Sequence, residues 1–145
     1  MHKKPTVLGA QKALQVLSAV VQETPLQFNK RLSEALSASI FLKREDQQQV
    51  RSFKIRGAFN KINALDPKEL EKGIVCASAG NHAQGFAFSC NQLQITGIVY
   101  MPIPTPNQKV EQVKMFGGSY VSIVLVGDTY DDSQQAALAH CKKDG

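Results

Sequence analysis

The chain has 145 residues, which is enough for one ordinary domain with a hydrophobic core. Hydrophobic residues make up 43% of the sequence and charged residues 20%, so the composition is globular and excludes a disordered tail. The formal net charge is +5, but the lysines and arginines are spread along the chain without a basic and aromatic stripe. We therefore expect no nucleic-acid partner, and the charge fits an anionic ligand equally well.

The cysteine pattern limits the cellular compartment and the metal chemistry that we expect. Cys76, Cys90 and Cys141 form no C-x-x-C pair, which favours a reducing compartment without disulfides. His140 adjoins Cys141, but no second ligand pair follows at metal-binding spacing, so we expect no metal site. The apolar stretch near the start is too short for a signal peptide, and no run reaches transmembrane length. We therefore expect a cytoplasmic protein that does not bind a membrane.

The first 50 residues predict two helices and a strand. Apolar residues recur at helical spacing over residues 7–21, and Thr24-Pro25-Leu26 ends that helix. A short second helix is expected at residues 30–36, followed by a strand at residues 39–44.

From residue 52 onward the sequence alternates between helices and apolar runs. A helix at residues 53–65 carries an apolar stripe, with Ser52 as its N-cap. Three runs rich in valine and isoleucine follow, at residues 74–77, 95–101 and 120–126. The helices after these runs begin near Asn81, near Pro106 and near Asp128, with Thr105 as the expected N-cap of the second and Pro106 in its first turn. This order predicts an α/β fold with an open parallel sheet and helices on both faces.

A lysine opens the helix at residues 53–65, within the sequence Ser-Phe-Lys-Ile-Arg-Gly-Ala. Lys54 lies in the first turn, with Arg51 before it and Arg56 after it, where the helix dipole favours acidic residues. The same field favours a neutral amine, and a neutral amine can attack a carbonyl group. The alternative is a basic, solvated first turn without a chemical role.

A second motif, Ser-Ala-Gly-Asn-His at residues 78–82, directly follows the first apolar run. The next helix would direct its free N–H groups above the carboxyl end of the strand, where ligands bind in open α/β sheets. Gly80 lets the backbone approach a ligand, while Ser78 and Asn81 add hydrogen bonds to an anion such as a carboxylate. The alternative is a strand-to-helix turn that only needs a cap, with His82 as a capping or packing residue.

Together the two motifs place a lysine amine beside an anion site. They lie about 25 residues apart, across one predicted strand–helix unit. An enzyme that holds an aldehyde cofactor and presents an amino acid to it needs these two features. The pair therefore favours such chemistry more strongly than either motif alone.

Around these motifs the sequence resembles the serine/threonine dehydratase family of pyridoxal-phosphate enzymes, which has the tryptophan-synthase-β-like fold. The resemblance covers about 120 residues in the family's order and is closest to the threonine-deaminating members. The matching segments are residues 24–26, 42–46, 52–57, 78–85, 101–106 with Lys109, 116–118 and 127–129.

The resemblance implies a role for each residue of the two motifs. Lys54 would form the Schiff base with pyridoxal phosphate, Phe53 would lie beside the cofactor ring, and Asn81 would hydrogen-bond the ring's phenolic oxygen. The substrate carboxylate would be held by the turn that comprises Ser78, Ala79, Gly80, Asn81 and His82. The implied reaction is the conversion of threonine to 2-oxobutanoate and ammonia, a first step towards isoleucine.

The resemblance also implies a domain organisation. Residues 1–45 would belong to a large cofactor-binding domain, and residues 46–145 would form the small α/β domain. The family's tetraglycine phosphate loop comes later in its chain, and no glycine-rich run follows residues 117–118 here. We therefore expect an N-terminal fragment of a homo-oligomeric enzyme, with a sheet incomplete at the C-terminus and no activity of its own.

Two alternatives remain open at this stage. Within the same family, the parent could be a serine dehydratase or a serine racemase. In a different class, the chain could be a short non-catalytic module that binds amino acids or a partner through the turn at Asn81.

Overall fold

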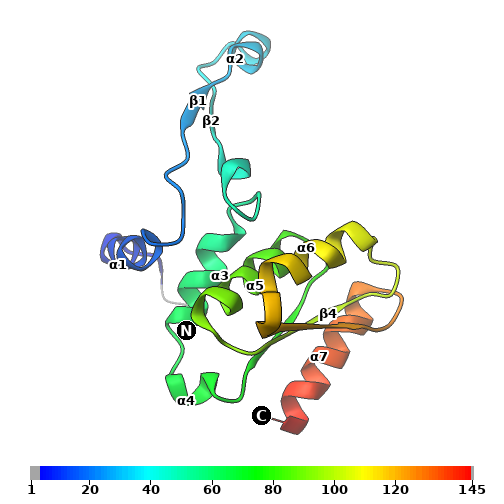
Figure 1. Cartoon of the computed structure of the whole chain (residues 1–145). Helices are drawn as coiled ribbons and strands as arrows, with labels where there is room; N and C mark the ends of the chain where they lie inside the picture. The colour runs from blue at the N-terminus through cyan, green and yellow to red at the C-terminus, as the bar shows by residue number, and fades with distance from the viewer. Residues whose placement is uncertain (1–3, 145) are drawn as a thin grey trace.

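The computed structural model describes residues 4–144 and contains, within them, a three-stranded parallel sheet in the order β3-β4-β5 (Figure 1). The strands are β3 (Ile74–Ala77), β4 (Gly97–Met101) and β5 (Val121–Leu125). Ile74 pairs with Gly97, and Gly97 pairs in turn with Val121. The three apolar runs are therefore the three strands, as the sequence predicted.

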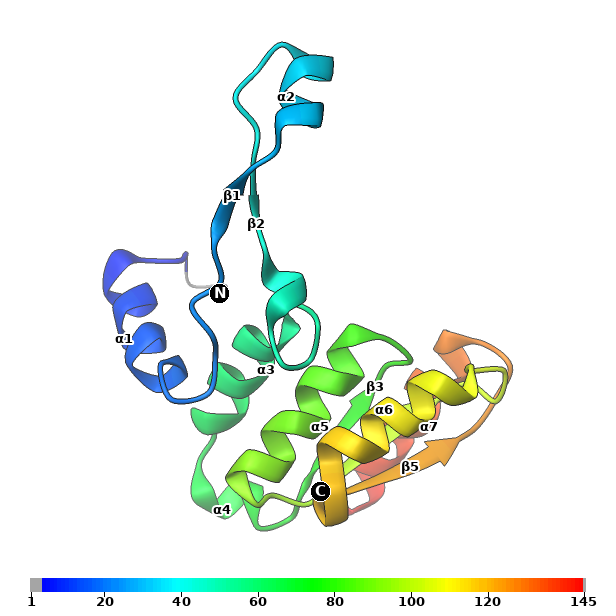
Figure 2. The same ribbon diagram turned by 45° about the horizontal axis from the view of Figure 1, so that its top comes forward.

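Helices cover both faces of this sheet, which confirms the predicted fold class. α5 (Asn81–Leu93) and α6 (Asn107–Gly117) pack together on one face, while α7 (Tyr130–Asp144) contacts β3 and β4 from the other (Figure 2). α3 (Lys54–Asn63) lies against α5. A short α4 (Pro67–Leu70) and the 3-10 turns η1 (Glu45–Gln47) and η2 (Gly118–Tyr120) complete the body.

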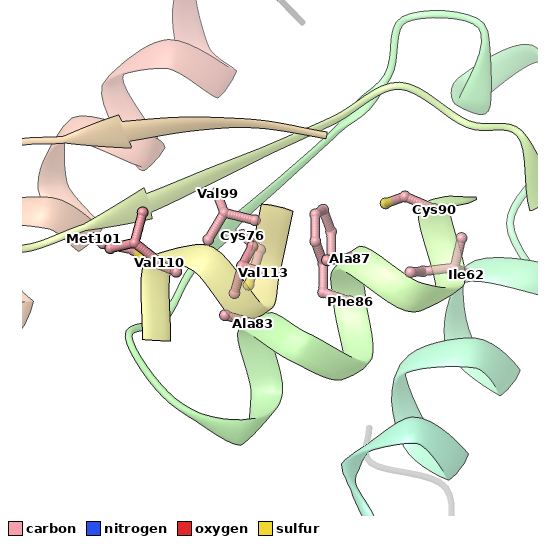
Figure 3. Close-up of a cluster of buried hydrophobic side chains, with 10 residues drawn as sticks. All are labelled: Ile62, Cys76, Ala83, Phe86, Ala87, Cys90, Val99, Met101, Val110 and Val113. Atoms are coloured by element: carbon pink, nitrogen blue, oxygen red, sulfur yellow. The ribbon is translucent and has the colours of Figure 1, made fainter. Parts of the chain in front are cut away.

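The core lies between α5 and the sheet. Residues 83–90 of α5 are all buried, so this helix is enclosed by protein on every side apart from its two ends. Figure 3 shows the side chains that form this core, which come from α3, α5, α6, β3 and β4: Ile62, Cys76, Ala83, Phe86, Ala87, Cys90, Val99, Met101, Val110 and Val113.

The N-terminal segment projects from the body as an arm (Figures 1 and 2). α1 (Val7–Leu17) lies beside α3, and beyond it an antiparallel pair, β1 (Leu26–Phe28) and β2 (Phe41–Lys43), carries α2 (Lys30–Leu36) at its tip. The sequence did not predict β1, because Pro25 was interpreted only as a helix terminator. The arm exposes large apolar side chains: Leu26, Phe28, Leu36 and Phe41.

Two predicted helix caps are wrong. Phe53, and not Ser52, occupies the N-cap position of α3; the buried Ser52 hydroxyl has no hydrogen-bond partner among the described residues. The Thr105 hydroxyl donates to the Pro102 carbonyl at 2.7 Å, which leaves Pro106 at the N-cap position of α6. In both cases the helix begins one residue later than the expected cap requires, and the buried hydroxyl makes no hydrogen bond to its first turn.

A polar network joins the N-terminal segment to α3. The Glu45 carboxylate accepts hydrogen bonds from Arg56 Nε and Nη2, at 2.8 and 2.7 Å, and from Thr24 Oγ1 at 2.6 Å. Nearby, the buried Gln48 side chain exchanges two hydrogen bonds with the backbone of Gln22. A bidentate arginine–carboxylate pair fixes both distance and orientation, so this network holds the first turn of α3 against the segment before it.

The ion pair makes the stability of the fold sensitive to acid. The hydrogen bonds from Arg56 lower the pKa of Glu45 from 4.5 to about 2, against the raising effect of desolvation. Because the folded-state pKa is the lower one, the stabilising contribution of this carboxylate is present above about pH 4.5. It is lost progressively as the pH falls toward about 2.

The substitution Glu45→Gln is expected to lower the free energy of unfolding at neutral pH by about 1–3 kcal/mol, because the half-buried Arg56 loses its charged partner. The difference from the wild type should shrink as the pH is lowered from about 4.5 toward about 2. Urea denaturation over this range measures both effects. Glu111→Gln removes the exposed pair with Lys114 and is the control, with an expected loss below about 1 kcal/mol. Equal losses in the two variants would contradict the assignment.

Candidate active site

Lys54 is the first residue of α3, and its side chain is open to solvent. Its ammonium group stands 5.1 Å from the centroid of the exposed Phe53 ring, which is a cation–π distance. Phe53 precedes the helix and makes no side-chain capping bond, as expected of an apolar residue. A free amine and a flat apolar surface therefore lie side by side at the start of α3.

Of the two arginines expected to add positive charge beside Lys54, Arg56 is neutralised by an ion pair. The Arg56 guanidinium turns away to the Glu45 carboxylate, so its charge is compensated within the body. Arg51 lies in the turn before the helix, with a left-handed backbone (φ 58°). The sequence placed Arg56 near Lys54 by spacing alone, and the partner that compensates its charge comes from η1.

The second motif forms the turn between β3 and α5. The Ser78 N–H continues the sheet by donating to the Tyr100 carbonyl at 3.1 Å, and Gly80 occupies the N-cap position. Asn81 and His82 are the first two residues of α5, and both are exposed. No side chain of the described residues caps this helix, so its first N–H groups are available to an anion beyond the carboxyl end of β3.

A cavity of about 260 Å³ brings the two motifs together. Its lining combines the start of α3 with the second residue of α5: Phe53, Lys54, Gly57, Ala58 and His82. A larger cavity of about 630 Å³ adjoins it along the edge of β3 and shares three of these residues. Lys61 and Tyr130 line the larger cavity only. Lys54 and His82, the last residue of the turn, therefore face one common space.

Burial and the charge of Lys54 both shift the pKa of His82. Its side chain remains open to solvent, yet the surrounding protein desolvates the ring and lowers the pKa of His82 below its ordinary value. The Lys54 ammonium lowers it further by charge repulsion. The imidazole is therefore neutral at pH 7 and can accept a hydrogen bond or a proton at the edge of the cavity.

The structure brings together part of the predicted site. Lys54, Phe53 and His82 line one cavity, while Ser78, Ala79, Gly80 and Asn81 form the turn that leads into it without being among its lining residues. The individual roles given to these residues stay predictions. Sequence reasoning missed Tyr130, which enters from α7; a lone tyrosine so far along the chain gave no local signal.

Other kinds of chemistry find little support in the described residues. Burial raises the pKa of Cys76 and of Cys90 to about 12, so neither thiol is a nucleophile at neutral pH. Among residues 4–144, no group of three or more histidine, cysteine, aspartate or glutamate side chains is arranged to hold a metal ion. In the same range, no helix combines the length and the apolar character needed to cross a membrane.

Comparison with known proteins identifies the family. Residues 17–145 match the family described as "Pyridoxal-phosphate dependent enzyme". A biosynthetic L-threonine dehydratase of Halalkalibacterium halodurans is 60% identical over 121 residues, which are 83% of this chain and 29% of that protein. The chain spans about 30% of the length of the curated relatives it matches.

Solved structures agree with this match. The processed form of threonine deaminase isoform 2 from Solanum lycopersicum superposes with a TM-score of 0.80 and 38% identity, over 100% of this chain and 40% of that one. Maize serine racemase superposes with a TM-score of 0.84 and 30% identity, over 93% of this chain and 40% of that one. The lysine and the turn at its side thus belong to a fold shared with these enzymes, and the chain is a member of the pyridoxal-phosphate dependent enzyme family.

Proposed function

We propose that, in a protein of the relatives' length, this chain supplies part of the active site for the pyridoxal-phosphate-dependent deamination of L-threonine to 2-oxobutanoate and ammonia. The observation that carries the proposal is the common cavity of Lys54 and His82, at the carboxyl end of β3. The 60% identity to a biosynthetic L-threonine dehydratase supports the choice of substrate.

The residues around the cavity fit the cofactor. Lys54 offers an exposed primary amine to its aldehyde, the Phe53 ring offers a flat surface, and Asn81 offers an amide in the turn that leads into the cavity. A methyl group placed on Gly80 would meet nothing within 4 Å, so the turn leaves open space for a bound molecule. When bound through Lys54, pyridoxal phosphate supplies an electron sink for the bonds at the substrate's Cα.

The chain's own residues position the substrate and move its protons. The uncapped first turn of α5, with Ser78 and Asn81, holds the threonine carboxylate by hydrogen bonds and by the helix dipole. Lys54 Nζ takes the proton from Cα, and the hydroxyl group leaves C3 as water. The resulting enamine hydrolyses to 2-oxobutanoate and ammonia. The neutral His82 imidazole stands within the same cavity as an acceptor.

A serine dehydratase or a serine racemase is the second candidate. The superposition with maize serine racemase supports it, because that enzyme shares the fold at 30% identity. The higher identity to threonine dehydratases favours threonine. A non-catalytic module that binds an amino acid at the Asn81 turn needs no turnover, and an ammonia-release assay on a protein of the relatives' length distinguishes it from both enzymes.

We further propose the setting in which this site works. Residues 1–45 belong to a large domain and residues 46–145 to a small domain, which agrees with the projecting arm and its exposed Phe28 and Phe41. The protein is cytoplasmic and forms a homo-oligomer. It binds neither nucleic acid nor membranes.

The 145-residue chain alone is expected to bind pyridoxal phosphate weakly and to leave threonine unchanged. No glycine-rich run of the kind that cradles a phosphate follows residues 117–118, so the cofactor's phosphate lacks its strongest contacts. Absorbance titration with the cofactor and an assay coupled to 2-oxobutanoate test this. Turnover above the background of the free cofactor would refute it.

In a protein of the relatives' length, borohydride reduction should fix the phosphopyridoxyl group on Lys54 and not on Lys61. Both lysines line the connected cavities, but only Lys54 lies at the start of α3 beside the turn. Peptide mapping locates the group. Lys54→Ala should abolish turnover by removing the anchor and the base together, whereas Lys61→Ala should retain most of it. An adduct on any other lysine would defeat the assignment.

A further inference from the structure

α5 passes the start of α3 at close range, and a glycine lies at the point of contact. A methyl group built on Gly85 would stand 3.1 Å from the carbonyl carbon and oxygen of Lys54 and 3.1 Å from the amide nitrogen of Ile55. Such distances are tighter than ordinary contacts, and the atoms met are backbone atoms that cannot rotate away. Gly85 therefore packs directly against the peptide unit that carries the lysine.

The same glycine is tied to the second motif through its own helix. Gly85 follows Asn81 by four residues, so the two lie on the same side of α5, one turn apart. The contact is held firmly on both sides, because Ile55 is fully buried and residues 83–90 of α5 are buried too. The distance from Lys54 to the turn at residues 78–82 is thus fixed by how closely α5 approaches α3.

We propose that Gly85 is a positioning residue, which sets the separation between the Lys54 amine and the Ser78–His82 turn. The proposal rests on the function proposed above, in which these two groups act on one substrate. A side chain at position 85 pushes the first turn of α3 away from α5, and the fold survives while the two halves of the site move apart. Gly85 touches neither cofactor nor substrate in this assignment.

The pKa of His82 reports this separation and can be measured without cofactor. His82 lines the cavity with Lys54 and is repelled by the Lys54 charge, so its titration reports the distance between the two side chains. The other titratable groups lining its two cavities are Lys61, Cys76 and Tyr130. None of these three residues is substituted in the variants used to measure the pKa of His82. Proton NMR follows the ring, with His82→Gln to assign its signal.

The experiment compares Gly85→Ala with the wild type, with Lys54→Ala as the calibration. Lys54→Ala should raise the pKa of His82 toward its ordinary value, and Gly85→Ala should give a rise in the same direction by part of that amount. In parallel, trapping with pyridoxal phosphate and borohydride in a protein of the relatives' length measures labelling of Lys54 relative to Lys61. This ratio should fall by roughly tenfold to a hundredfold in Gly85→Ala, as expected for a misplaced reactive group.

Gly97→Ala is the matched control for overpacking. Its methyl group would also crowd α5, at 2.7 Å from Cys90 Sγ and 2.9 Å from the Phe86 ring, but from the side of the sheet and away from Lys54. It should lower stability, leaving the His82 titration and the labelling ratio unchanged. Equal changes in both variants would show a general packing effect and overturn the proposal.

The remaining outcomes also decide the matter. An unshifted His82 titration in Gly85→Ala, with an unchanged labelling ratio, refutes the positioning role. Loss of the far-ultraviolet circular dichroism of Gly85→Ala refutes it too, because Gly85 is then required for folding itself. If the His82 titration moves but wild-type Lys54 is never labelled, the positioning role stands and the proposed function fails.

Discussion

The packing of α5 against α3 is the constraint on which the site depends. Lys54 and the turn at residues 78–82 come from different elements, and the proposed function requires them at a fixed distance from each other. Only a helix with very small residues on the contact side can approach a neighbouring backbone so closely, and Gly85 meets this condition at the peptide unit of Lys54 itself.

α5 divides its residues between two tasks along its length. Asn81 and His82 are exposed at its start, and the next eight residues are buried between α3, α6 and the sheet. The buried part has no freedom to tilt, because it is in contact with protein on all sides. The exposed end is therefore positioned by the buried part of the helix, which is how a scaffold preorganises polar groups.

Much of this arrangement was predictable from the sequence, for identifiable reasons. The strands were found because runs such as residues 74–77 are uniformly apolar, and a parallel sheet buried on both faces requires this. The turn at residues 78–82 was expected to form a ligand site because such sites form at the carboxyl ends of parallel strands. The resemblance to known enzymes supplied the chemical roles, which spacing alone could not give.

What the sequence could not show depends on contacts between distant residues. Ser52 has the composition of a cap, but burial of its hydroxyl prevents it from serving as one. Nothing in the sequence indicated that Arg56 forms an ion pair, because its partner Glu45 comes from a separate element, η1. α4 differs from these cases, because it was not predicted although its start signal is local. Asp66 caps the helix and Pro67 is its first residue.

The order of the strands has a consequence for how the chain acquires its structure. β3 pairs with β4 and β4 with β5, so each strand meets its partner after a single intervening helix. Each pairing spans a single crossover, so less loop entropy is lost than in a sheet whose neighbouring strands lie further apart in the chain. On a ribosome, the sheet can therefore assemble in the order of synthesis, strand by strand. Lys54 and the turn at residues 78–82 would then be in place as soon as α5 had docked, well before translation of a protein of the relatives' length was complete.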